Sequence, residues 1–353
     1  MFKSKRFLGI GITGLGCALL AGCAGMMAEP TGVVVPGAKW EEVSRTGLIF
    51  GEGVVAAADG SIYYSDLTRA LPPAKNPGGT IYRFNPATGQ TAKYLEPSEM
   101  SNGLHVDRNG DLLIAQDAGG EGKGGGRAIA RRNLATGAMS VVAGRYQGKR
   151  FNGSNDLTSD AQGRVYFSDV LYTGKEPVEL PNAVYRVDPD GKVTQLSTDI
   201  FRPNGIEVSP DGRRLYVAAF NTKALPTNRN GPAVDKFGIP FGAVVAYDLD
   251  SNGNVSNGRV FFRNDELGVD GMTLDRQGNL YVAMHNGNPK NPNTGIVVLR
   301  PDGQLLERIP TPGVGWTTNL GFGRGADANS LYVTTAIPIR LFRIQTVRRG
   351  HYF

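Results

Sequence analysis

The sequence predicts an all-β protein, a six-bladed β-propeller of four-stranded antiparallel blades. The first observation is a series of turn glycines ahead of apolar runs, spaced 50, 53, 49 and 66 residues apart. Short strands that recur at such a period are typical of propellers, whereas the repeats of a β-solenoid are usually far shorter. These turns are Asp59-Gly60, Asn109-Gly110, Gln162-Gly163, Asp211-Gly212 and Gln277-Gly278.

A second turn follows in each repeat, which leaves room for four strands in about 50 residues. Glycine favours such hairpin turns because it accepts positive φ without steric cost. No stretch after the N-terminal segment keeps helical spacing, so we expect almost no helix. The second turns are Thr88-Gly89, Thr136-Gly137, Asp190-Gly191, Asn252-Gly253 and Asp302-Gly303.

The third observation is a polar residue eight positions before each turn glycine in the first five repeats. A sixth polar residue precedes the Asp327-Ala328-Asn329 turn by a slightly longer approach. Because the first strand of each blade lines the central channel, residues at one repeat position should point at a common centre. These residues are Glu52, Asn102, Asn155, Asn204, Asp270 and Asn319; we call them the ring.

Two carboxylates and four amides would be costly to bury unpaired. A cation resolves that cost, and oxygen ligands of this kind suit Ca²⁺ before Mg²⁺, with Mn²⁺ or Zn²⁺ as other divalent candidates. Zinc is disfavoured because the chain has 3 histidines and none lies close to another in sequence. The alternative is that the ring residues simply form turns before glycine, which Glu52 and Asn155 do not fit.

Residues 1–22 are predicted to be a targeting segment with a basic start, an apolar run and the closing sequence Leu20-Ala21-Gly22-Cys23. This resembles a bacterial lipoprotein signal, which implies cleavage before Cys23 and acylation of its thiol. The alternative is an ordinary secretory signal cut nearby. We then expect a tether over residues 23–38, the propeller over 39–347 and a frayed tail over 348–353. The expected location is the cell envelope, on the periplasmic face of the outer membrane.

Composition limits the possible partners. The formal charge is +6, but Lys3, Lys5 and Arg6 lie in the targeting segment, and no long basic run argues for nucleic acid. Both cysteines, Cys17 and Cys23, also lie there, so the folded domain can form neither a disulfide nor a thiolate metal site. We expect a monomer whose partner is a small-molecule substrate.

The chain resembles the SMP-30/gluconolactonase family of six-bladed propellers, which is similar to diisopropyl-fluorophosphatases. In that family the positions matching Glu52, Asn155, Asn204 and Asp270 hold a divalent metal, and Asp270 matches the base or nucleophile of lactone hydrolysis. The segments that carry the resemblance are Gly51-Glu52-Gly53, Ser101-Asn102-Gly103-Leu104, 149–156 with Tyr166-Phe167-Ser168-Asp169, Pro203-Asn204-Gly205-Ile206, Val269-Asp270-Gly271-Met272 and Thr318-Asn319-Leu320-Gly321-Phe322-Gly323.

The resemblance implies a Ca²⁺-dependent lactonase, with Asn102, Arg150 and Tyr172 as candidates for substrate contact. His285 is expected to end a strand on the active face, where it could serve as a general base or be a surface loop residue. Long segments at 66–79, 117–127, 169–182, 220–241 and 285–295 are expected to form a lid. The alternative function is a non-catalytic envelope propeller with a structural Ca²⁺; a strictosidine-synthase-like propeller is disfavoured because the acidic ring is intact.

Overall fold

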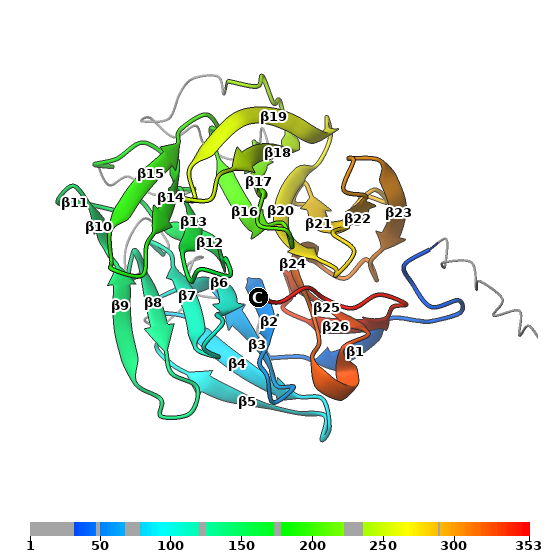
Figure 1. Cartoon of the computed structure of the whole chain (residues 1–353). Coiled ribbons are helices and arrows are strands. Elements are labelled where there is room, and N and C mark those ends of the chain that lie inside the picture. The colour runs from blue at the N-terminus through cyan, green and yellow to red at the C-terminus, as the bar shows by residue number, and fades with distance from the viewer. Residues whose placement is uncertain are drawn as a thin grey trace, which may run out of the picture. The chain divides into compact units, whose positions relative to one another are not determined.

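The computed structural model describes residues 32–46, 50–67, 78–119, 125–172, 178–221, 236–288 and 290–353. These residues form six four-stranded antiparallel sheets around a central channel, so the predicted propeller is confirmed (Figure 1). In the described part of the chain the only helical element is a short 3₁₀ turn, η3 (Gly325–Asp327), as expected. No helix formed by these residues is long and apolar enough to cross a bilayer. The predicted targeting segment and Cys23 lie outside the described residues.

The strands of blades 1 to 3 run outward from the channel in chain order (Figure 1). Blade 3 is preceded by a small hairpin of β10 (Arg145–Tyr146) and β11 (Lys149–Arg150). Blade 1 is β2 (Gly51–Ala56), β3 (Ile62–Asp66), β4 (Thr80–Asn85) and β5 (Gln90–Leu95); blade 2 is β6 (Ser101–Val106), β7 (Leu112–Gln116), β8 (Ala128–Arg132) and β9 (Met139–Ala143); blade 3 is β12 (Ser154–Ser159), β13 (Val165–Asp169), β14 (Ala183–Val187) and β15 (Val193–Ser197).

Blades 4 and 5 repeat this order. Blade 6 closes the circle of blades because its outermost strand comes from the beginning of the propeller. Strand β1 (Glu41–Ser44) pairs antiparallel with β26 (Leu341–Gln345) and so joins the two ends of the domain. Blade 4 is β16 (Pro203–Val208), β17 (Arg214–Phe220), β18 (Gly242–Leu249) and β19 (Val255–Asn264); blade 5 is β20 (Gly268–Leu274), β21 (Leu280–His285), β22 (Gly295–Leu299) and β23 (Leu305–Pro310); blade 6 is β24 (Trp316–Phe322), β25 (Ser330–Ala336), β26 and β1.

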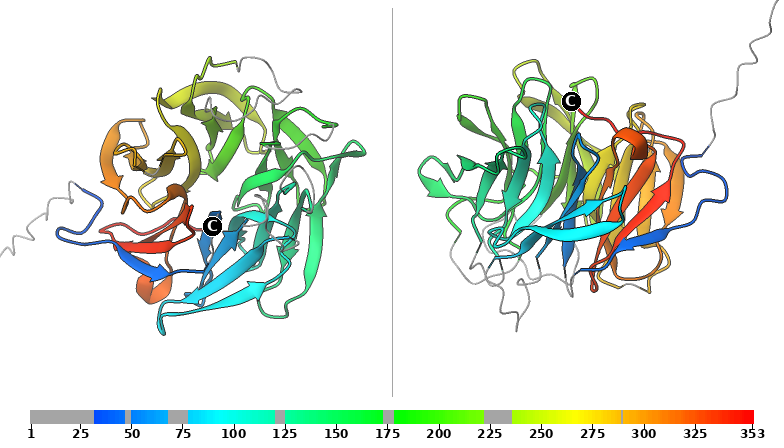
Figure 2. Two further views of the ribbon diagram at one scale, coloured as in Figure 1. Left: turned by 180° about the vertical axis from the view of Figure 1, so that it is seen from behind. Right: turned by 90° about the horizontal axis from the view of Figure 1, so that it is seen from below.

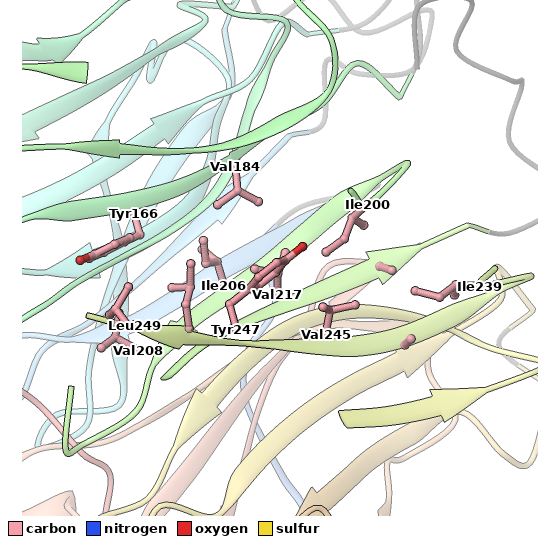
Figure 3. Close-up of a cluster of buried hydrophobic side chains, with 13 residues drawn as sticks. Tyr166, Val184, Ile200, Ile206, Val208, Val217, Ile239, Val245, Tyr247 and Leu249 are labelled. Atoms are coloured by element: carbon pink, nitrogen blue, oxygen red, sulfur yellow. The ribbon is translucent and has the colours of Figure 1, made fainter. Parts of the chain in front are cut away.

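The core lies between neighbouring blades. Figure 3 shows the cluster between blades 3 and 4, where Tyr166 and Val184 of one blade pack against Ile206, Val217 and Val245 of the next. Fully burying one such side chain contributes about 1.5–3 kcal/mol. All five turn glycines that mark the repeat have positive φ, between 68° and 84°, as their hairpin role requires.

The folded part begins earlier than the expected residue 39. Val33 is fully buried, and the Val35 N–H donates to the Gln345 carbonyl at 3.1 Å while the Val347 N–H donates to the Val33 carbonyl at 2.8 Å. An apolar Val-Val-Val run gains more by packing beside the end of β26 than by remaining in water. Residues 33–38 are therefore part of the propeller and not of a tether.

The expectation of a frayed tail is also wrong. Gly350 forms a bridge with Asp275, the His351 N–H donates to the Leu274 carbonyl at 2.9 Å, and the Tyr352 ring lies under the Arg324 guanidinium at 3.7 Å. The C-terminus lies at the centre of the ring of blades in Figure 1 and at one end of the channel in the side view of Figure 2. The ring residue of this blade, Asp270, lies near the start of β20, whereas Leu274 is its last residue. The tail therefore covers the end of the channel that is remote from the ring residues.

Candidate functional site

All six ring residues lie on the inner strands of their blades and are buried. The alternative that they form turns is therefore wrong. In blades 1 to 5 the regular pairing of the inner strand is interrupted at the ring residue, as between Gly51 and Val54 around Glu52. Such a bulge bends the strand and changes the direction of a side chain. In blade 6 the interruption falls at Thr318, so Asn319 is a regularly paired residue.

Glycines after the ring residues let neighbouring inner strands approach one another. A Cβ on Gly53 would lie 2.5 Å from the Asn102 carbonyl oxygen, and one on Gly205 would lie 2.4 Å from the Asp270 carbonyl oxygen. Both are backbone contacts that a side chain could not tolerate. These glycines are therefore required by close packing at the axis.

Asp156 follows the ring residue of blade 3, where blades 1, 2, 4 and 5 have glycine, and it was not among the predicted site residues. It is buried, and its Oδ2 accepts a 3.4 Å hydrogen bond from Asn319 Nδ2 of blade 6, the opposite blade. Asn319 Oδ1 accepts the Leu320 N–H at 2.8 Å. Because both ends of the Asn319 amide are engaged, this residue braces the ring.

The other amides present their oxygens differently. Asn102 Nδ2 donates to Asp117 Oδ2 at 3.4 Å, and Asn204 Nδ2 donates to the Tyr172 hydroxyl at 2.9 Å. Each of these bonds uses the NH₂ group and leaves the Oδ1 for another partner. Asn155 Oδ1 is buried and has no hydrogen-bond partner among the described residues. A buried acceptor left unpaired costs about 1–3 kcal/mol, which argues for a ligand at this point.

The ring is also strongly acidic. Burial raises the pKa of Glu52 well above its ordinary value, and the negative charges of Asp270 and Asp156 raise it further. Burial likewise raises the pKa of Asp156 to about 7 and raises the pKa of Asp117 above its ordinary value. A divalent cation bound at the ring would neutralise these carboxylates.

The donor set therefore fits a hard divalent cation. Among the described residues no three His, Cys, Asp or Glu side chains form a metal-binding group by themselves. An ion at the ring would depend on the amide oxygens of Asn155 and Asn204 in addition to the carboxylates of Glu52 and Asp270. Mixed carboxylate and amide oxygens are the ligands that Ca²⁺ prefers.

His285 ends β21 and lies at the ring. Its Nε2 is 2.9 Å from Asp270 Oδ2, and both side chains are buried. Asp117 lies 15 residues after Asn102, and His285 lies 15 residues after Asp270. Each of the two contacts the ring residue of its own blade. This second repeat position is the signal by which Asp117 could have been found from the sequence.

The other substrate-contact candidates are placed differently. Tyr172 lies beside Asn204, packs edge-on against Phe220 with ring centroids 6.2 Å apart, and has a pKa that burial raises well above its ordinary value. Arg150 is exposed on the β10–β11 hairpin, which Figure 1 places at the rim of the propeller. The structure therefore brings Tyr172 to the ring and does not bring Arg150 there. Each of the five expected lid segments lies partly outside the described residues, which omit 68–77, 120–124, 173–177, 222–235 and 289.

The raised carboxyl pKa values predict how stability changes with pH. Burial raises the pKa of both Asp156 and Asp169 to about 7 in the folded state, above about 3.9 in the unfolded chain. The stability that these two carboxyl groups contribute is fully present at pH values below the pKa of the unfolded chain, and it is lost as pH rises through about 7. Burial lowers the pKa of His105 to about 3. His105 therefore makes stability rise with pH, but only at pH values below the pKa of an unfolded histidine, about 6.5.

We therefore expect the melting temperature of chelator-treated protein to fall between about pH 6.5 and 8.5. Saturating Ca²⁺ should reduce or reverse this fall, because the ion binds the deprotonated carboxylates. Differential scanning calorimetry across this range, with and without Ca²⁺, tests the expectation. A melting temperature that rises with pH in chelator would contradict it.

Comparisons with known proteins point to one family. The profile of the SMP-30/gluconolactonase/LRE-like region matches residues 122–337. The chain is 30% identical to a gluconolactonase of Zymomonas mobilis over 76% of this chain and 71% of that protein, and 31% identical to the pentonolactonase XacC of Haloferax volcanii over 73% and 74%.

Solved structures show the same fold. A gluconolactonase from Xanthomonas campestris aligns with a TM-score of 0.68 at 24% identity, covering 89% of this chain and 91% of that one. A calcium-binding regucalcin from Agrobacterium tumefaciens aligns with a TM-score of 0.65 at 21% identity, covering 89% and 96%. On the profile match and the 30% and 31% identities, the chain belongs to the SMP-30/gluconolactonase/LRE-like family.

Proposed function

We propose that this protein is a gluconolactonase-like hydrolase of sugar or other small lactones that depends on a divalent metal, Ca²⁺ above others. The observation that carries the proposal is the buried ring, in which Asn155 Oδ1, beside the carboxylates of Glu52 and Asp270, has no partner within the described part of the chain. Relatives named gluconolactonase and pentonolactonase support the reaction. A relative named regucalcin and a structural neighbour described as calcium-binding support the ion.

In this proposal Glu52, Asn155, Asn204 and Asp270 hold the ion, which when bound would polarise the carbonyl oxygen of the lactone. Asp270 accepts a proton from a water molecule, and the water oxygen bonds to the carbonyl carbon. The bond between that carbon and the oxygen of the lactone ring then breaks, Asp270 returns its proton to that oxygen, and a hydroxy acid leaves. The Tyr172 hydroxyl, which burial keeps protonated, and the Asn102 amide are the groups proposed to contact the substrate.

A screen of the purified domain tests the reaction. We expect hydrolysis of at least one class among aldonolactones and acyl lactones, loss of hydrolysis in chelator and recovery with Ca²⁺. A pH-stat assay measures the acid released, and phosphotriesters extend the screen to the neighbouring chemistry. No hydrolysis in any arm, with chelation lowering only the melting temperature, would favour a structural ion in a non-catalytic propeller.

The proposal includes a lipid anchor at Cys23 that holds the enzyme at the periplasmic face of the outer membrane. The support is the basic start, apolar run and Leu20-Ala21-Gly22-Cys23 sequence. Cys23→Ser should release soluble or unprocessed protein, as judged by membrane fractionation and by the loss of incorporated radioactive fatty acid. Unchanged membrane association of Cys23→Ser would contradict acylation at this thiol.

A further inference from the structure

His285 is held tightly by aromatic side chains. Its imidazole stacks on the Trp316 ring with centroids 5.4 Å apart and planes 15° apart, and the Phe220 ring lies 4.9 Å away at 48°. Gly268 pairs with His285, and a Cβ on Gly268 would lie 2.5 Å from the Phe220 ring. The His285 side chain is 5% exposed. Its orientation is therefore fixed by packing.

Both ring nitrogens of His285 also have partners. The Gly287 N–H can only donate, and it reaches His285 Nδ1 at 3.3 Å, so Nδ1 is the accepting nitrogen. Nε2 lies 2.9 Å from Asp270 Oδ2, and an ionised carboxylate can only accept. These partners assign the proton to Nε2.

We propose that His285 is a positioning residue that orients Asp270 through a fixed Nε2–H donor, and that it is not the general base. A general base needs a lone pair directed at the proton it removes, and the Nδ1 lone pair is directed at Gly287 instead. Binding Asp270 Oδ2 from one side leaves Oδ1 and the remaining lone pairs for the ion and the water. Asp117 stands at the same repeat position and contacts Asn102, in this case as the acceptor of the Asn102 Nδ2–H.

Partners of this kind hold a metal ligand in its binding orientation, and removing one typically costs about 10–100-fold in metal affinity or activity. The inference rests on the proposed function where it concerns Asp270 as the base. The orientation of a metal ligand can be measured without any substrate. Two variants separate the contribution of the N–H donor from that of the aromatic side chain. His285→Gln keeps an N–H donor, and His285→Phe keeps an aromatic side chain between Trp316 and Phe220.

We expect His285→Phe to lower Ca²⁺ affinity, measured by titration calorimetry on chelated protein, and kcat by about 10–100-fold each, with KM little changed. His285→Gln should retain at least about tenfold more of both than His285→Phe. Equal losses of kcat in the two variants with unchanged Ca²⁺ affinity would overturn the proposal, because that is the behaviour of a base. Unchanged affinity and kcat in both variants would overturn it as well.

Trp316→Leu tests the stacking contact. It should weaken Ca²⁺ binding in the wild type and have no further effect in the His285→Phe background, since the donor is already absent there. The matched control is the chain's second tryptophan: Trp40 packs edge-on against Phe342 at 6.4 Å and donates to the Pro310 carbonyl. Trp40→Leu should leave Ca²⁺ affinity unchanged. If Trp316→Leu weakens Ca²⁺ binding further in the His285→Phe background, Trp316 does not act through His285, and this part of the proposal is contradicted.

The tautomer is tested on the unaltered protein by long-range ¹H–¹⁵N NMR. The chain has 3 histidines, and the signals lost in His285→Gln identify His285. We expect the proton on Nε2 with and without Ca²⁺; a proton on Nδ1 would overturn the proposal. If no lactone is hydrolysed, the proposed function fails, while the NMR and calorimetric results still decide whether His285 orients Asp270.

Discussion

Asp270→Asn is expected to abolish lactone hydrolysis while the propeller stays folded. The change keeps the size of the side chain and one oxygen but removes a charge and the basic carboxylate. Loss of a general base costs about 10²–10⁴-fold in rate. The fold should survive, since it depends mainly on apolar contacts between blades such as the cluster around Tyr166 and Val245.

Ca²⁺ separates the two roles of Asp270. Affinity for the ion should fall in Asp270→Asn, and kcat measured at saturating Ca²⁺ should still be at least about 100-fold below that of the wild type. Asp248→Asn, a change on the outer surface where Asp248 pairs with Arg259 at 2.8 Å, is the matched control and should hydrolyse normally. Full recovery of turnover at high Ca²⁺ would reduce Asp270 to a ligand and require another base at the ring.

The propeller could be predicted because its strongest signals are local. A turn glycine needs positive φ, so Gly60, Gly110 and Gly163 mark the repeat in the sequence itself. Polar residues at one repeat position then share one structural environment, which is why Glu52 and Asn155 could be placed on inner strands before the structure was known.

The missed features depend on packing between segments far apart in the chain. Asp156 was missed because it stands where blades 1, 2, 4 and 5 have glycine. Its hydrogen bond to Asn319 of the opposite blade is seen only in the folded structure. Tyr352 lies over the end of the channel, where it contacts Arg324. This contact does not follow from the sequence repeat. The position of Arg150 away from the ring has a related cause. A two-residue strand on the β10–β11 hairpin interrupts the repeat and carries this side chain to the rim.

Gly103→Ala is expected to destabilise the propeller and weaken Ca²⁺ binding together. A Cβ at this position would lie 2.2 Å from Asp156 Oδ1, 2.7 Å from Asp156 Cα and 3.0 Å from the Asn155 carbonyl oxygen. Two of these are backbone atoms of β12, so the inner strands of blades 2 and 3 would have to separate. Overpacking of this kind typically costs about 1–3 kcal/mol. The displaced strand carries Asn155, so the proposed ion site should loosen with it.

Gly144→Ala is the matched control for this change, because it adds the same methyl group in the same blade where there is room for it. The nearest atoms to a Cβ at Gly144, the Ala128 Cβ and the Val141 Cγ1, lie 3.9 Å away. Thermal unfolding and Ca²⁺ titration should therefore show a loss in Gly103→Ala and none in Gly144→Ala. Lower stability with unchanged Ca²⁺ affinity in Gly103→Ala would mean that Asn155 is not a ligand. No change in either quantity would mean that the inner strands can separate at no cost, and the packing account of the ring glycines would be wrong.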